Sequence, residues 1–201
     1  MLSGCATKPN IVSKDNMQIL NSEQRVALLQ KKKAWRLRGK IAFIQKIPDE
    51  QDKRESATIF WQVDENKNKQ TLDLTSYLGI NVLHLSSTQG EHFLKVDGKE
   101  YHSDNLSQLI YSLTGLTLPT EALSFWLKGL PYQADDQVVF DSKTSLPTSI
   151  TSNYHNASWQ ISYEKYQIFK QLPMATKFTI KKNGLLIKIA IKQWTFTDKT
   201  S

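Results

Sequence analysis

Cysteine occurs once in this 201-residue sequence, at position 5, directly after the tripeptide Leu-Ser-Gly. A single thiol allows no disulfide bond within the chain, so the chemistry open to Cys5 is reaction with another molecule. The residue stands close to the beginning of the sequence, and a polar stretch follows it from Ala6 to about Lys14. A cysteine in this position is a suitable attachment point for a lipid, and Cys5 is therefore the first candidate functional residue.

The tetrapeptide Leu2–Cys5 is similar to the lipobox of bacterial lipoproteins. In such proteins a signal peptidase cleaves before the cysteine, whose sulfur and new amino group then carry acyl chains. The positively charged start and the apolar stretch of a signal peptide are missing, so we interpret residues 1–4 as the remnant of one. We expect residues 5–15 to form a lipidated tether and residues 16–201 to form a single domain. The alternative interpretation is an incidental or buried free cysteine.

Other reactive groups do not form a recognisable catalytic or metal-binding pattern. The four histidines, His84, His92, His102 and His155, are never four residues apart, the spacing that puts two ligands on one helix face. The sequence has no glycine-rich phosphate loop and no nucleophile elbow. We therefore predict no catalytic residue, no metal site and no cofactor, and the protein is not expected to be an enzyme.

The chain is basic, with a formal net charge of +7 and an isoelectric point near 9.4. Such a charge favours anionic partners, and both nucleic acid and acidic lipid headgroups qualify. The positive residues begin with the run Lys31–Lys33 and are then spread along the sequence as far as Lys192. We interpret them as a solvated basic surface rather than a nucleic-acid site. No run approaches the roughly 18 apolar residues of a membrane-spanning helix.

Hydrophobic periodicity predicts a mainly β protein. A first helix is expected over residues 16–33, and alternation with period two begins at Trp35. Two short helices interrupt the strands. One is expected to begin at a cap on Ser103 or Asp104 and to stop at Gly115, and the other follows Pro119 and ends near Gly129. Hairpin turns are expected at residues 97–98 and 183–184. The predicted strands cover residues 35–43, 55–63, 72–74, 80–85, 92–96, 100–101, 138–140, 149–151, 159–163, 177–181 and 185–194.

This pattern indicates an α+β fold in which ten or eleven antiparallel strands form an open or incomplete barrel, with helices packed over it as a lid. Many tryptophan, tyrosine and phenylalanine residues lie on the predicted strands and central helices. A sheet wrapped around helices can enclose an apolar cavity that binds small or elongated ligands. A solid aromatic core would leave the same pattern, so the residues alone do not decide between the two.

Several segments together resemble the LolB family of outer-membrane lipoprotein receptors, over about Trp35 to Trp194. They occur in the order expected for that family. These segments are Arg38–Ile44, Phe60–Gln62, Leu78-Gly79, Leu113–Gly115, Phe125–Pro131, and the single residues Trp159 and Trp194.

The resemblance implies a specific role. LolB proteins are lipid-anchored at the outer membrane and face the periplasm. They accept acylated lipoprotein cargo from a LolA-like periplasmic carrier and place it in the inner leaflet of the outer membrane. The partners implied are thus this carrier, the cargo and outer-membrane lipid, with no nucleic acid. An alternative is a lipoprotein that stores or senses a lipid or small ligand without transferring it, and another is a structural lipoprotein with a solid core.

Two groups of residues would carry this role. Leu78, with Tyr77 beside it, lies at a predicted turn and would contact the bilayer during release, unless Leu78 folds back onto its own strands. The second group combines strand alternation with an apolar helix face, and we expect it to contribute to the acyl-chain cavity and its lid. Its members are Ile41, Phe43, Trp61, Leu113, Trp126, Leu127 and Trp159.

Overall fold

The computed structural model describes residues 20–76, 78–114 and 118–197. Cys5, Tyr77 and Gly115 lie outside these residues, as do the predicted tether and signal remnant. The helices are α1 (Ser22–Lys31), α2 (Leu106–Thr114) and α3 (Thr120–Trp126), together with a short 3-10 helix, η2 (Glu65–Lys67). The strands are β1 (Ala34–Gln45), β2 (Lys53–Asp64), β3 (Lys69–Thr75), β4 (Asn81–Thr88), β5 (Glu91–Val96), β6 (Lys99–Ser103), β7 (Gln137–Phe140), β8 (Pro147–Tyr154), β9 (Ala157–Phe169), β10 (Leu172–Lys182) and β11 (Leu185–Thr197).

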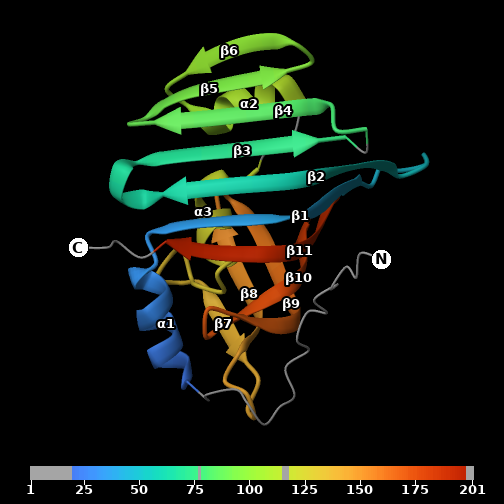
Figure 1. The fold of residues 1–201 in the computed structure, drawn as a ribbon. Helices are drawn as coiled ribbons and strands as arrows, with labels where there is room; N and C mark the ends of the chain where they lie inside the picture. Colours follow the sequence, from blue (N-terminus) through green and yellow to red (C-terminus); the bar gives the residue numbers. More distant parts are fainter. Residues whose placement is uncertain (1–19, 77, 115–117, 198–201) are drawn as a thin grey trace, which may run out of the picture.

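The eleven strands form one antiparallel sheet in the order β6-β5-β4-β3-β2-β1-β11-β10-β9-β8-β7. Strands β6 and β7 are its two edges and do not pair with each other, so the sheet is not closed. Figure 1 shows a strongly twisted sheet with α2 behind β4 and β5, α3 behind the middle, and α1 beside the C-terminal end of β11. The open antiparallel barrel with covering helices, expected from the sequence, is confirmed.

Buried and exposed side chains alternate along the strands, as the sequence predicts. In β1, Trp35, Leu37 and Ile41 are buried, whereas Arg36, Arg38 and Lys40 between them are exposed. Successive side chains of a strand point to opposite faces, so one face of β1 packs on the helices and the other meets solvent. We call the second of these the outer face of the sheet.

The two predicted hairpins form at the expected positions. Asp97 and Gly98, with φ of 49° and 77°, connect β5 to β6, as a two-residue turn with positive φ requires. In the second hairpin Lys182 pairs with Leu185, leaving Asn183 and Gly184 as the loop between β10 and β11.

The helix boundaries differ in part from the prediction. Within the described residues α1 begins at Ser22, because the side chain of Asn21 accepts a hydrogen bond from the Gln24 amide and closes a capping box. The cap of α2 is neither Ser103 nor Asp104. Asn105 Oδ1 accepts from the Gln108 amide at 3.0 Å, and Ser103 Oγ supports the turn before it.

Helix α3 ends where the glycine predicts. The Gly129 amide donates to the Trp126 carbonyl at 2.8 Å, and the Leu130 amide donates to the Phe125 carbonyl at 3.1 Å. Gly129 has φ of 71°, which completes a Schellman motif that only glycine adopts without steric cost.

The buried residues divide into two apolar clusters. The large one, the main core, joins the helix-facing side of the central strands to α1 and α3. The small one lies under α2 and consists of Leu85, Leu94, Leu106, Leu109 and Ile110. Leu72, Leu83 and Leu118 are partly buried and pack against both clusters. Helix α2 therefore rests on its own small cluster at one end of the sheet.

Candidate functional site

The turn between β3 and β4 presents apolar side chains to solvent. The Gly79 amide donates to the Ser76 carbonyl at 3.0 Å, and the Ser76 amide donates to the Ile80 carbonyl at 2.8 Å, so the turn itself is hydrogen-bonded. Leu78 is 81% exposed and Ile80 is 63% exposed. Leu78 therefore does not fold back onto its own strands, and this turn exposes two large apolar side chains to water.

Most of the predicted cavity residues lie in the main core. Ile41, Trp61, Trp126, Leu127 and Trp159 are buried there, and Phe43 packs against them from a partly buried position. The Trp126 and Trp159 rings have their centroids 5.9 Å apart. These side chains fill the interior of the sheet by packing on one another, and contact with acyl chains stays a prediction for them.

Leu113 lies apart from the other six. It is partly buried and packs against the small cluster. The structure therefore does not bring all seven residues into one site. Six belong to the main core, to which α3 contributes Trp126, and the seventh belongs to α2.

An open groove of about 760 Å³ lies along the first turn of α2 and along α3. Its apolar lining includes Val63, Leu106 and Phe125. None of the seven predicted cavity residues lines this groove. The remaining lining residues are Asp64, Glu65, Asn68, Lys69, Gln70, Ser87, Gly90, His92, Asp104, Asn105, Ser107, Thr120, Glu121, Ser124, Tyr132 and His155.

Two pairs of polar side chains and one buried hydroxyl group lie in the groove. The Tyr132 hydroxyl donates to Glu121 Oε2 at 2.8 Å, and burial, followed by this carboxylate, raises the pKa of Tyr132 to about 12. His92 Nδ1 lies 2.7 Å from Ser87 Oγ, and burial lowers the pKa of His92. Thr120 is 7% exposed, and its hydroxyl has no hydrogen-bond partner within the described part of the chain. Sequence reasoning missed these residues, because no local motif marks them.

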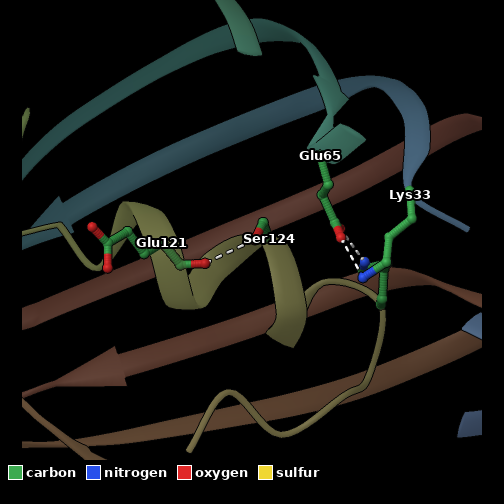
Figure 2. Close-up of polar contacts among 5 residues, drawn as sticks. Lys33, Glu65, Glu121 and Ser124 are labelled. Atoms are coloured by element: carbon green, nitrogen blue, oxygen red, sulfur yellow. Dashed lines mark hydrogen bonds and ion pairs between the residues drawn. The ribbon is translucent and has the colours of Figure 1, made fainter. Parts of the chain in front are cut away.

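A buried ion pair stands at the rim of this groove. Lys128 Nζ donates to Glu65 Oε1 at 2.9 Å, and the Lys128 side chain is only 2% exposed. Lys33 Nζ reaches the other carboxylate oxygen of Glu65 at 2.9 Å, as Figure 2 shows. Burial lowers the pKa of the Lys128 ammonium, and Glu65 opposes that shift. The cluster ties the end of α3 to the connection between β2 and β3.

The same end of α3 is also held by α1. Arg25 is 1% exposed, and its Nη2 donates to the Lys128 carbonyl at 2.9 Å. Its Nε donates to the Pro173 carbonyl at 3.4 Å. A Cβ at Gly129 would lie 3.3 Å from Arg25 Nη1, so the glycine also leaves room for the guanidinium. Helix α3 is thus fixed at its C-terminal end by charged groups from two other parts of the chain.

The described residues contain no helix long and apolar enough to cross a membrane. Within the same residues, no three histidine, cysteine or acidic side chains are grouped as metal ligands would be.

The fold places the protein in a known structural class. A LolA superfamily protein from Nitrosomonas europaea superposes with a TM-score of 0.53 at 7% identity, covering 89% of this chain and 94% of that one. A DUF1329 family protein from Desulfovibrio piger superposes with a TM-score of 0.51 at 7% identity, covering 90% and 93%. At such low identity the likeness concerns the fold, an open antiparallel sheet with helices against one face.

Sequence comparison narrows the class to one family. The family described as outer membrane lipoprotein LolB matches residues 33–194. The outer-membrane lipoprotein LolB of Aeromonas hydrophila is 30% identical over 98% of this chain and 92% of its own length. That of Vibrio cholerae is 30% identical over 97% and 91%, and that of Shewanella baltica is 28% identical over 96% and 84%. The chain belongs to the LolB family, and it is an outer-membrane lipoprotein involved in lipoprotein localisation.

Proposed function

We propose that this protein takes acylated lipoproteins from a LolA-like periplasmic carrier and releases them into the inner leaflet of the outer membrane. The observation that carries the proposal is the exposed apolar turn between β3 and β4. A leucine that is 81% exposed beside an isoleucine that is 63% exposed gains free energy only when another apolar phase covers both. For a lipoprotein of the outer membrane, the nearest such phase is the bilayer.

Acyl chains would enter between α2 and the sheet. Among the described residues, the buried side chains that α2 packs on belong to the small cluster, so moving the helix outward would uncover Leu85 and Leu94 and leave the buried residues of the main core in place. Acyl chains could then replace the helix on these side chains, at about 0.8 kcal/mol for each methylene group buried. The groove along α2 and α3 would be the entrance, and its polar residues would surround the ester and peptide groups next to the acylated cysteine.

Release would be driven by differences in affinity along the route. A tenfold preference at each step requires only about 1.4 kcal/mol, which a few additional apolar contacts supply. Burying Leu78 in the bilayer would contribute roughly 1.5–3 kcal/mol. This is enough to bring the loaded receptor to the membrane surface, and too little to act as the anchor. Cys5 would supply the anchor.

A transfer assay tests the proposal. A LolA-like carrier loaded with a labelled lipoprotein is mixed with this protein and then with liposomes, in the absence of ATP. The label is expected to pass first to the receptor and then to the liposomes. Leu78→Glu should accept cargo nearly normally and insert it into liposomes at least tenfold more slowly. Leu28→Glu is the matched control, because Leu28 is an exposed leucine on α1, away from the turn.

Each step has an outcome that counts against the proposal. If wild-type protein takes no label from the carrier, the receptor role is wrong. If it takes the label and keeps it in the presence of liposomes, the protein stores its ligand, as in the alternative function. If Leu78→Glu loses stability or cargo uptake instead of insertion, Leu78 has a structural role and the membrane contact is wrong.

A further inference from the structure

The outer face of the central strands collects the positive charge of the chain. Strands β1, β10 and β11 contain eight lysine and arginine residues and no aspartate or glutamate. The whole sequence has 26 basic and 19 acidic residues, so without these eight it would carry slightly more negative than positive charge. The exposed members of the group are Arg36, Arg38, Lys40, Lys177, Lys181, Lys188 and Lys192.

The strand register puts these side chains on one face. Lys40 pairs with Ala190, which in turn pairs with Lys177, so the three lie in a row across β1, β11 and β10. Lys188 of β11 and Lys181 of β10 lie on the same face, in the next two rows of paired residues. Directly paired residues in a sheet point to the same side, and here that side is turned away from α2 and α3. The carboxylate that the register places nearest in β9 is Glu164, opposite Lys177.

A hollow of about 260 Å³ lies within this face, between β1 and β11. Its polar lining consists of two cross-strand pairs, Arg36 with Thr195 and Arg38 with Gln193. The register shifts between Arg38 and Gly39, where an extra residue of β11 forms a β-bulge.

The hollow has a defined backbone and one positioned arginine. A Cβ at Gly39 would lie 2.3 Å from the Ala190 carbonyl oxygen, so the close approach of the two strands beside the hollow requires glycine. The Arg38 guanidinium lies over the Phe60 ring, 5.0 Å from its centroid. This cation–π contact holds the guanidinium group over the sheet.

These groups match a phosphate in chemistry and size. Guanidinium groups donate paired hydrogen bonds to phosphate oxygens, and a hydroxyl and an amide complete the donor set. The volume is below the roughly 300–1,000 Å³ of sites that enclose a drug-sized ligand. It suits a headgroup whose remainder stays outside, and the surrounding lysines would attract further anionic headgroups.

We propose that the outer face of β1, β10 and β11 docks on anionic phospholipid at the bilayer surface, with the Arg36–Arg38 hollow as a phosphate-headgroup site. This inference rests on the proposed function and adds an orientation to it. The helices and the groove lie on the opposite side of the sheet, so a receptor bound through its outer face keeps the groove open to the carrier. Leu78 would supply the apolar contact, and the basic face would supply electrostatic attraction.

The test measures binding of the full chain to vesicles, in a Cys5→Ala background so that acyl chains do not dominate. Vesicles of phosphatidylcholine alone are compared with vesicles that also contain phosphatidylglycerol. The double variant R36Q/R38Q should bind the anionic vesicles about 25-fold more weakly than the parent protein, since each cation near an anionic surface is worth roughly fivefold in affinity. The control K99Q/K143Q removes two exposed lysines from outside the face and should change binding less than about twofold.

Cargo uptake from the carrier separates this inference from the proposed function. R36Q/R38Q should take up cargo normally and keep the thermal stability of the parent. Equal binding to both kinds of vesicle, or an equal loss in both double variants, would show that no specific headgroup site exists. Loss of carrier binding with unchanged vesicle binding would make the face a protein-docking surface, and the inference would be wrong. If wild-type protein transfers no cargo yet prefers anionic vesicles, the proposed function is wrong, and the inference that the outer face binds anionic phospholipid is still supported.

Discussion

At the scale of single residues, Lys128 is a buried charged group whose ammonium is paired with one carboxylate. Its ammonium is removed from water and is balanced by Glu65, which also binds the more exposed Lys33. A buried charge without its partner costs far more than an exposed pair contributes. Glu65 therefore keeps the end of α3 attached to the β2–β3 connection at the rim of the groove.

Replacing Glu65 by glutamine is expected to lower the free energy of unfolding by about 3 kcal/mol, because Lys128 is left buried and unpaired. Lys33→Gln, the matched control, should cost about 1 kcal/mol or less, since Lys33 is half exposed. Chemical denaturation measures both. Equal effects of the two substitutions would show that the burial of Lys128 is not what makes the pair important.

The pH dependence gives a second readout for Glu65→Gln. Burial already lowers the pKa of Lys128 from its ordinary value of 10.5, and loss of Glu65 should lower it further. A lysine with a lowered folded-state pKa releases its proton more readily when folded, so stability is lost as the pH falls through that pKa and is recovered toward 10.5. The stability deficit of the variant should therefore narrow as the pH is raised toward 10.5.

At the scale of elements, α2 differs from α3 in how it is held. Helix α3 belongs to the main core and is fixed at its end by Lys128 and by Arg25. Helix α2 contributes three of the five buried residues of the small cluster, packs them on Leu85 and Leu94 of the sheet, and shares partly buried leucines with the main core. Elements with few buried contacts open at a lower free-energy cost. We therefore interpret α2 as the moving part of the lid and α3 as its fixed part.

Leu113→Glu tests this division of the lid. A carboxylate on the inner side of α2 would stand where acyl chains are proposed to lie, so cargo acceptance from the carrier should fall at least tenfold. The melting temperature should change little, because Leu113 is outside the main core. Tyr111→Glu on the same helix is the control, since Tyr111 is 58% exposed and should accept cargo normally. Normal acceptance by a folded Leu113→Glu protein would exclude Leu113 from the lid.

At the scale of the whole molecule, the sheet separates three surfaces. The groove and helices occupy one face, the basic strands form the outer face, and the apolar turn lies at a sheet end. The proposed anchor is attached outside this domain. Under the proposed function, membrane attachment, membrane docking and cargo binding would depend on different residues, and we expect that each can be changed without the others.

Cys5→Ala tests that separation. Protein expressed with a complete signal peptide should carry acyl groups on Cys5, detected by mass spectrometry, and should fractionate with the outer membrane. The Cys5→Ala protein should be released in soluble form and should still take cargo from the carrier, because several acyl chains are needed for stable attachment and none of them contributes to the core. An unmodified N-terminus in the first experiment would remove Cys5 from the mechanism.

Much of the fold could be predicted from the sequence because its signals are local. Alternation such as that of Trp35, Leu37 and Ile41 identifies a half-buried strand without reference to any partner. Asp97-Gly98 and Gly129 specify a hairpin and a helix end through their own backbone preferences. The strands, the three helices and the open antiparallel arrangement followed from such signals, together with the family resemblance. The expected cap of α2, Ser103 or Asp104, lies one or two residues before the observed cap, Asn105, because several neighbouring polar residues can serve as caps.

Only the tertiary structure decided where the distant groups meet. Lys128 is 63 residues from Glu65 in sequence, and no local pattern predicts that one neutralises the other. The separation of Leu113 from Trp126 and Trp159 depends on how two helices share one sheet. The basic residues are scattered along the sequence. Those of β1, β10 and β11 come together on one face of the sheet because β1 pairs with β11 and β11 pairs with β10. Pairing of strands that are far apart in sequence is set by the packing of the whole core. The composition alone therefore determined the net charge, whereas the fold determined where on the molecule the positive charge lies.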